Sequence, residues 1–212
     1  MSNLFPRFSQ RYLVTGRDPT TTGTQVVTNL LERARGYQEF MDQYAGTTFN
    51  HGVYRVHPLA RRVKWDALIG EAFPGHVGRF STFAYDWMGR QFALDAQRTE
   101  NSEPLVLLFD PGFGEALEIP TTFLAFHESE LIEHGDAALA DTVFEEWLRT
   151  GHSPPGPTEC IGYKVSPLLG GEDQLENNEM SDLEVYWSLS AQVLAQTRHL
   201  EAGAVVRQVK ID

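Results

Sequence analysis

The sequence is poor in cysteine and in long apolar runs. Cys160 is the only cysteine of the 212 residues, so no intramolecular disulfide can form. A membrane-spanning helix needs about 18 to 20 consecutive apolar residues, and the best run here, 105–109, is far shorter. No apolar stretch follows Arg7 and Arg11, so the sequence predicts no signal peptide. Together these features predict a cytoplasmic protein with no membrane partner.

The common cofactor and catalytic motifs are absent as well. There is no Gly-x-x-x-x-Gly-Lys phosphate loop, no Gly-x-Gly-x-x-Gly, no His-Glu-x-x-His and no Gly-x-Ser-x-Gly. Residues 111–114, Pro-Gly-Phe-Gly, precede an expected strand rather than a helix, so they are unsuited to binding phosphate. Glu159 lies beside Cys160, and its charge opposes thiolate formation. We therefore expect no cofactor, no bound metal and no catalytic nucleophile.

Basic residues are scarce in the second half of the chain. Residues 104–212 carry 5 Lys and Arg against 19 Asp and Glu, a net charge of −14, whereas residues 1–103 carry 12 against 10. No Lys or Arg occurs between Arg98 and Arg149. A field of this sign repels phosphate backbones and attracts cations or a basic protein surface. The sequence therefore predicts no direct nucleic-acid binding, although an acidic surface can also serve solubility alone.

The hydrophobic pattern predicts an α+β fold. Residues 1–24 show no sustained period and are expected to be irregular. Four apolar segments with turns between them predict an antiparallel meander between residues 77 and 119, and the run 105–109 is typical of a buried strand. Helices are expected before and after it, over 24–44 with a break at Gly36, 59–73, 121–134, 136–148 and 181–199. This order of elements predicts helices flanking a largely antiparallel sheet, in one body or in two closely packed subdomains.

Two small constellations are candidates for chemistry. His127, Glu130 and His134 are spaced i, i+3 and i+7, which places them on one face of an expected helix, where they could ligate zinc or iron. Asp86 and Asp95 flank an expected hairpin and could act as an acid and base pair. The alternatives are that Asp86 and Asp95 serve turn geometry and that a complete metal ligand set is lacking.

The most distinctive segment is 162–187, GYKVSPLLGGEDQLENNEMSDLEVYW. Gly170 and Gly171 allow a sharp turn, and Ser181 with Glu184 has the spacing of a capping box at the start of the last helix. A loop held between such a turn and a capped helix can present its side chains rigidly to a partner. The residues expected to contact that partner are Glu172, Asp173, Glu176, Asn177, Glu179 and Asp182.

This segment, with two others, resembles a known family. The first of the others is Tyr37-x-x-Phe40 followed by residues 44–55, YAGTTFNHGVYR. The second is 85–95, YDWMGRQFALD, followed by 114–120, GEALEIP. The chain in these segments resembles the immunity proteins that accompany DNase effectors of bacterial type VI secretion systems (the Tde/Tdi type), over about residues 30–195.

The resemblance implies a GAD-like domain over residues 25–120 and an acidic immunity domain over 121–212. It also implies that the chain binds and neutralises a cognate toxin, a basic DNase domain, by protein–protein interaction and without catalysis. Two other classes stay open at this point: a small hydrolytic enzyme that uses the His/Glu face or the Asp pair, and a scaffold or regulatory module for an endogenous protein.

Overall fold

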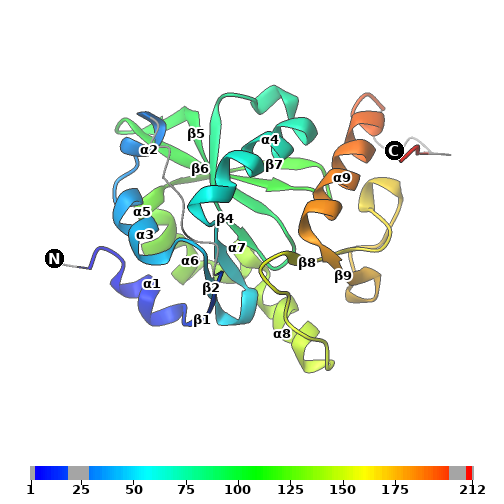
Figure 1. Ribbon diagram of the computed structural model, residues 1–212, viewed down its shortest axis with the longest axis horizontal. Coiled ribbons are helices and arrows are strands. Elements are labelled where there is room, and N and C mark those ends of the chain that lie inside the picture. The colour runs from blue at the N-terminus through cyan, green and yellow to red at the C-terminus, as the bar shows by residue number, and fades with distance from the viewer. Residues whose placement is uncertain (1–2, 19–28, 201–208, 212) are drawn as a thin grey trace.

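The computed structural model describes residues 3–18, 29–200 and 209–211. Within these residues, a seven-stranded antiparallel sheet lies at the centre, and each strand pairs with its neighbours in sequence (Figure 1). Its strands are β1 (Val14–Arg17), β2 (Thr47–Phe49), β3 (Tyr54–Val56), β4 (Phe80–Asp86), β5 (Gln91–Glu100), β6 (Glu103–Asp110) and β7 (Glu115–Thr122). A separate antiparallel ribbon is formed by β8 (Glu159–Tyr163) and β9 (Asn178–Asp182). The predicted α+β fold and its central meander, β4 to β7, are confirmed.

Helices cover both faces of the sheet (Figure 1). On one face lie α4 and α9, and most of the others pack on the opposite face or beyond its edge. The α-helices of the described residues are α1 (Pro6–Arg11), α2 (Asn29–Glu32), α3 (Tyr37–Tyr44), α4 (Arg62–Ala72), α5 (Phe123–Ala125), α6 (Leu131–Glu133), α7 (Gly135–Leu139), α8 (Asp141–Arg149) and α9 (Leu183–Thr197). Strand β4, the first half of β5 and most of β6 are therefore removed from water on both sides, whereas β1 and β7 keep exposed residues.

This double cover explains the apolar run in β6. Val106 and Leu108 pack in the hydrophobic cluster that contains α1, α3 and α5, while Leu107 and Phe109 pack in the cluster that contains α4 and α9. Successive side chains of a strand point to opposite faces, so a strand covered on both sides needs apolar residues without alternation. The prediction of a buried strand at 105–109 is confirmed.

The N-terminal segment is more ordered than the sequence indicates. Residues 6–17 form α1 and the edge strand β1, so the expectation of an irregular segment over 1–24 is wrong there; residues 19–24 lie outside the described residues. Helix α1 is only six residues long, too short to display a helical period. Its Phe8 is fully buried, and Glu128 accepts hydrogen bonds from the backbone N–H groups of Arg7 (3.2 Å) and Phe8 (2.9 Å). Glu128 therefore caps α1.

Three helix predictions need correction. The helix expected over 136–148 is broken at Ala140, which has a left-handed φ of 51° and separates α7 from α8. The helix expected over 121–134 is divided into α5, a π-helical segment at Phe126–Glu130, and α6. The last helix is capped by Asp182 rather than by Ser181: the Asp182 carboxylate accepts from the N–H groups of Glu184 and Val185, both at 3.0 Å. Ser181 is in β9 and pairs with Cys160. A strand that runs directly into a helix moves the cap one residue along the chain.

The break predicted at Gly36 is confirmed, because α2 ends before it and α3 begins after it, with a left-handed φ of 79° at Gly36 itself. The N-terminal end of that expected helix, 24–28, lies outside the described residues. Both hydrophobic clusters draw side chains from before and after residue 120. The two halves of the chain therefore share their cores.

Candidate functional site

His127 does not face solvent with Glu130 and His134. Its ring is fully buried, and its centroid lies 4.1 Å from that of the Phe40 ring, inside the aromatic part of the core. Nδ1 faces the carbonyl oxygen of Phe123 (2.8 Å) and must donate to it, so Nε2 accepts from the Tyr54 hydroxyl (2.9 Å). Burial lowers the pKa of His127 to about 3, which keeps the imidazole neutral. Both ring nitrogens are thus engaged inside the core.

His134 is exposed at the end of α6, away from the buried ring of His127. Among residues 3–18, 29–200 and 209–211, no group of three His, Cys, Asp or Glu side chains is placed to hold a metal ion. The helical-face hypothesis for His127, Glu130 and His134 therefore has no structural support.

Asp86 and Asp95 are both buried but lie at opposite ends of the β4–β5 hairpin. Asp95 is opposite Phe80 at the start of β4, whereas Asp86 ends that strand, and a seven-residue strand spans roughly 20 Å. Each carboxylate has its own arginine: Asp86 pairs with Arg90 at 2.6 Å and Asp95 with Arg79 at 2.5 Å. They form two separate buried ion pairs and not one acid and base site.

Cys160 and the turn at 111–114 serve packing. The thiol of Cys160 is buried, and burial raises its pKa, which disfavours the nucleophilic thiolate. A Cβ on Gly112 would lie 2.6 Å from the Tyr163 ring, and one on Gly114, which has a φ of +67°, would lie 2.2 Å from Leu194. The two glycines therefore let the β6–β7 turn approach the second layer of the protein.

The acidic segment contains two kinds of side chain. Asp173, Asn177 and Asp182 hold structure together: Asp173 accepts a 2.6 Å hydrogen bond from the Tyr163 hydroxyl, Asn177 braces the loop, and Asp182 caps α9. Glu172, Glu176 and Glu179 are exposed, and within the described part of the chain their carboxylates have no ion pair or hydrogen bond. The free acids thus stand on a frame built by their neighbours.

Asn177 is the brace of this loop. Its side-chain amide donates to the carbonyl oxygens of Val165 and Glu172, both at 2.8 Å, and its Oδ1 accepts from the N–H of Val165 at 3.0 Å. Gly171 lies so close to the same Val165 carbonyl that an added Cβ would stand 1.9 Å from the oxygen. These contacts fix the path of the chain from the glycine turn to β9.

We expect Asn177→Ala to lower the free energy of unfolding by about 1–2 kcal/mol, because three hydrogen bonds of a partly exposed loop are lost. Amide hydrogen exchange at Val165 should accelerate most, since its N–H loses its acceptor. Gln174→Ala is the control, because Gln174 is exposed in the same loop and its side chain makes no hydrogen bond among the described residues. Equal exchange at Val165 in both variants would contradict the brace.

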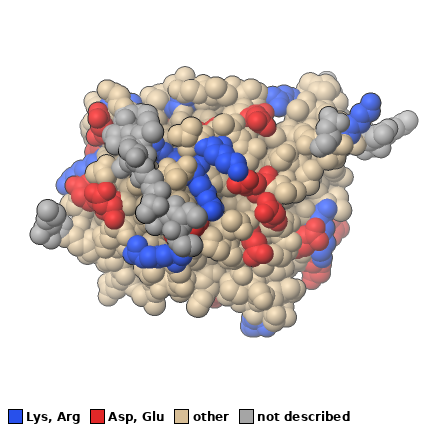
Figure 2. Space-filling view, viewed as in Figure 1, with Lys and Arg blue, Asp and Glu red and all other residues tan. Residues whose placement is uncertain are grey.

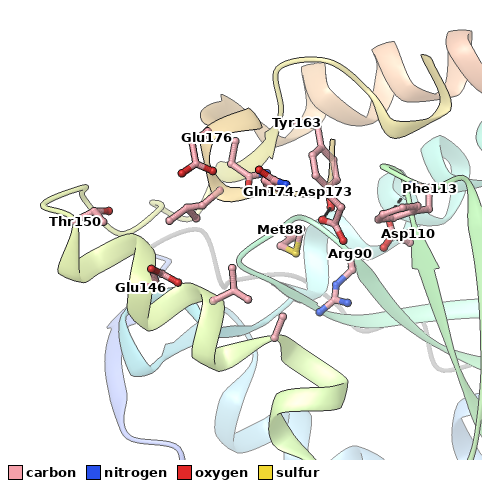
Figure 3. Close-up of a pocket in the computed structure, with 14 residues that line it drawn as sticks. Met88, Arg90, Asp110, Phe113, Glu146, Thr150, Tyr163, Asp173, Gln174 and Glu176 are labelled. Carbon is pink, nitrogen blue, oxygen red and sulfur yellow. Dashed lines mark hydrogen bonds between the residues drawn. The ribbon is translucent and has the colours of Figure 1, made fainter. Parts of the chain in front are cut away.

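A cavity of about 520 Å³ opens beside this loop (Figure 3). Its walls come from the β4–β5 turn, the β6–β7 turn, α8 and the β8–β9 ribbon with its loop. The side chains at one end are Asp110, Phe113, Tyr163 and Asp173, while Glu146 of α8 and Thr150, just after that helix, lie at the other end (Figure 3). The lining residues are Met88, Arg90, Asp110, Phe113, Ala140, Val143, Glu146, Thr150, Tyr163, Asp173, Gln174, Leu175, Glu176 and Asn178.

The cavity is acidic with apolar walls. Arg90 is its only basic lining residue in the described chain, and its guanidinium already pairs with Asp86 and donates to the Ala138 carbonyl at 3.1 Å. Asp110 is only 8 % exposed; its Oδ1 accepts from the N–H groups of Gly112 and Phe113. Burial raises the pKa of Asp110 and nearby Asp173 adds to the rise, while Arg90 opposes it. The cavity therefore favours a positively charged occupant.

Sequence reasoning found two lining residues, Asp173 and Glu176, through the density of acids around them. It did not single out Asp110, Phe113 or Tyr163, which lie at or beside turns and strands of the expected fold. The one available signal was the Asp-Pro-Gly-Phe-Gly turn at 110–114, which predicts a carboxylate bonded to the turn but does not indicate what lies opposite it.

Comparisons with known proteins show the fold alone. No protein-family model matches the sequence, and no curated protein matches it. Among solved structures the chain is similar to Atu4351 from Agrobacterium tumefaciens, with a TM-score of 0.58 and 12 % sequence identity over 89 % of this chain and 88 % of that one. The crystal structure of Atu4351 therefore contains a similar arrangement of helices and sheet.

No helix within the described residues has the length and apolar character needed to cross a bilayer. This agrees with the absence of a long apolar run in the sequence.

Proposed function

We propose that this chain is an immunity protein that binds and neutralises a basic toxin, of the DNA-cleaving kind that type VI secretion systems deliver. The observation that carries the proposal is the set of exposed carboxylates, Glu172, Glu176 and Glu179, held on a braced loop in the half of the chain with a net charge of −14. Free acids on an ordered support are suited to binding a basic protein surface.

The surface of such a toxin would carry the charge opposite to that of the acidic loop. A nuclease must hold a polyanion, so its substrate-binding surface is basic. An acidic inhibitor is attracted to that surface, which speeds the encounter and blocks the place where DNA would lie. The same charge on this chain repels nucleic acid, so inhibition by direct contact with the toxin is favoured over competition for DNA.

The residues that carry the family resemblance are the residues that build the support. Gly162 packs under the ring of Tyr186, where a Cβ would be 2.6 Å away, and Gly171 packs against Val165. Asn177 braces the loop and Asp182 caps the helix that follows. A sequence pattern made of such framework residues supports a fixed presentation of the acids between them.

Of the two alternatives, the enzyme hypothesis has less support than the scaffold hypothesis. The enzyme hypothesis relied on His127, Glu130 and His134 or on Asp86 and Asp95, and neither set is brought together. A scaffold that binds an endogenous protein would use the same exposed acids. Co-expression separates it from an immunity protein: growth arrested by a toxin encoded beside this gene should be restored by this chain, and a scaffold would not restore it.

The exposed acids should also control the rate of association. We expect Glu172→Lys, Glu176→Lys, Glu179→Lys, made together, to slow association with the toxin about tenfold or more at low salt, and to flatten its salt dependence. Asp173 stays unchanged because it holds Tyr163. Stopped-flow measurement at low and moderate salt gives both quantities.

The matched control reverses three exposed acids elsewhere: Glu32→Lys, Glu39→Lys, Glu100→Lys. Both variants change the net charge equally, so a long-range effect of net charge would slow association with the toxin equally in both. Acidic and basic side chains are interspersed on the face shown in Figure 2. A difference between the two variants would therefore depend on where the reversed charges lie, not on the net charge. If the control slows association as much as the loop variant, the loop is not the steering surface.

A further inference from the structure

We infer that the cavity beside the acidic loop is the receptor for one arginine side chain of the partner protein, with its guanidinium between Asp110 and Asp173 and its stem along Met88, Val143 and Leu175. This inference rests on the proposed function for the identity of the partner. It adds a buried anchor to the exposed acids, and buried anchors supply most of the affinity of a protein interface.

The lining of the cavity around Asp110 favours a cation. Asp110 is more than nine-tenths buried, and among the described residues its Oδ2 has no hydrogen-bond partner. Arg90 lies near it but is committed to Asp86, with Nε at 2.6 Å from Asp86 Oδ2. Arg90 thus serves two carboxylates: Asp86, which does not line the cavity, and Asp110, which does. A buried carboxylate without full compensation is costly, and a cation that enters the cavity removes that cost.

A second carboxylate is positioned beside the first. The Tyr163 hydroxyl donates to Asp173 Oδ1 at 2.6 Å, which fixes that side chain and leaves its other oxygen for a ligand. Figure 3 shows Asp110, Asp173 and Tyr163 together at one end of the cavity. Two carboxylates that converge on one space match the several N–H groups of a guanidinium better than the point charge of an ammonium group.

The remaining walls fit the rest of an arginine side chain. Phe113 is 37 % exposed and stands edge-on to Tyr163, with ring centroids 5.9 Å apart, so an aromatic surface is available for a planar cation. Met88, Val143 and Leu175 supply apolar contacts for a methylene stem. Glu146 and Glu176, away from Asp110 in Figure 3, add negative charge to the same lining.

The test uses the purified chain and N-acetyl-arginine amide as the probe. In a titration followed by ¹H–¹⁵N chemical shifts, the amides of Gly112, Phe113 and Tyr163 should move together and saturate. N-acetyl-citrulline amide has the same shape without the charge, and it should bind about tenfold more weakly or not at all. Shifts scattered over exposed acids, or equal binding of citrulline, would overturn the inference.

Variants locate the site. Asp110→Asn keeps an oxygen that can accept from Gly112 and Phe113, and it should weaken arginine binding about tenfold. Asp173→Asn, at an exposed carboxyl, gives the same test if the first variant fails to fold. Glu39→Gln is the charge-matched control and should bind arginine as the parent does. Parent-like binding in a folded Asp110 or Asp173 variant would overturn the inference.

The arginine titration requires no toxin, so it separates the inference from the proposed function. Saturable arginine binding without rescue of growth would retain the cavity and reject the immunity role. Rescue of growth without saturable arginine binding would retain the immunity role and reject the cavity as its anchor site. If both hold, Asp110→Asn should slow association with the toxin little and should speed dissociation about tenfold, as loss of a buried anchor does.

Discussion

Arg90→Met is expected to lower the free energy of unfolding by about 3–5 kcal/mol, because it leaves a fully buried carboxylate without its counterion. Arg90 donates from Nε to Asp86, whose side chain has no exposed surface, and from Nη2 to the Ala138 carbonyl. Burial raises the pKa of Asp86, and the charge of Arg90 opposes that rise. Without the arginine, Asp86 must be protonated or must stay charged at a high cost.

The double variant Asp86→Asn, Arg90→Met tests this cause. Removing both charges leaves no unpaired charge at the Asp86 position, and the loss of Arg90 beside Asp110 is common to both variants, so we expect the double variant to be more stable than Arg90→Met alone. Arg149→Met is the control, since the Arg149–Glu146 pair is exposed and contributes about 0.5 kcal/mol or less. Urea unfolding gives all three values. If the double variant is no more stable than Arg90→Met, the loss reflects packing or the Ala138 contact rather than an unpaired charge.

The central sheet was predictable because its signals are local. Hairpin turns at residues 86–90 and 110–115 separate apolar segments, and such segments pair with their sequence neighbours. Strands β1 and β2 belong to the same sheet but are only four and three residues long. A strand of that length gives too few alternations for a pattern, and its position depends on long-range pairing.

The failure of the histidine hypothesis has a geometric cause. Spacing of i, i+3 and i+7 places side chains on one face only if the helix keeps its α-helical period. The π-helical segment Phe126–Glu130 changes that period after α5. His127 then turns into the aromatic core with Phe40 and Tyr54, while His134 remains at the surface. The sequence contains no marker of this change.

The candidate site was predictable in part. The many acidic residues between Glu172 and Asp182 indicated the loop, and three of their carboxylates are exposed and unpaired among the described residues. The cavity beside it needs Asp110, Glu146 and Tyr163 as well, which come from a turn, a helix and a strand far apart in sequence. Only the packing of α8 and the β8–β9 ribbon against the β4–β5 and β6–β7 turns brings them together.

Two buried histidines should make the protein sensitive to acid. Burial lowers the pKa of both His57 and His127 to about 3, against about 6.5 in an unfolded chain. The unfolded state therefore binds more protons between these values, and the stability that the neutral rings confer is present above pH 6.5 and lost as the pH falls toward 3. Each ring accounts for about 1.4 kcal/mol per pH unit within that window, or about 2 kcal/mol between pH 6.5 and 4.5.

Buried carboxylates act in the opposite direction. Burial raises the pKa of Asp66, Asp86 and Asp110, so the folded state gains protons there as the pH falls. The contribution of one histidine is therefore measured as a difference between two chains that share these acids. His57→Gln suits this purpose, because a glutamine amide can replace Nε2 as the donor to Gln91 Oε1, at 2.7 Å in the parent.

The dependence of unfolding free energy on pH, measured by urea unfolding between pH 6 and 4.5, should be less steep in His57→Gln than in the parent by about one proton, or about 1.4 kcal/mol per pH unit. The variant is expected to be less stable at pH 7, since the ring no longer stacks on Tyr85 at 4.6 Å, and to approach the parent as the pH falls. His134→Gln removes an exposed imidazole and serves as the control. Equal slopes for His57→Gln and the parent would mean that His57 gains its proton in the folded protein as readily as in the unfolded chain.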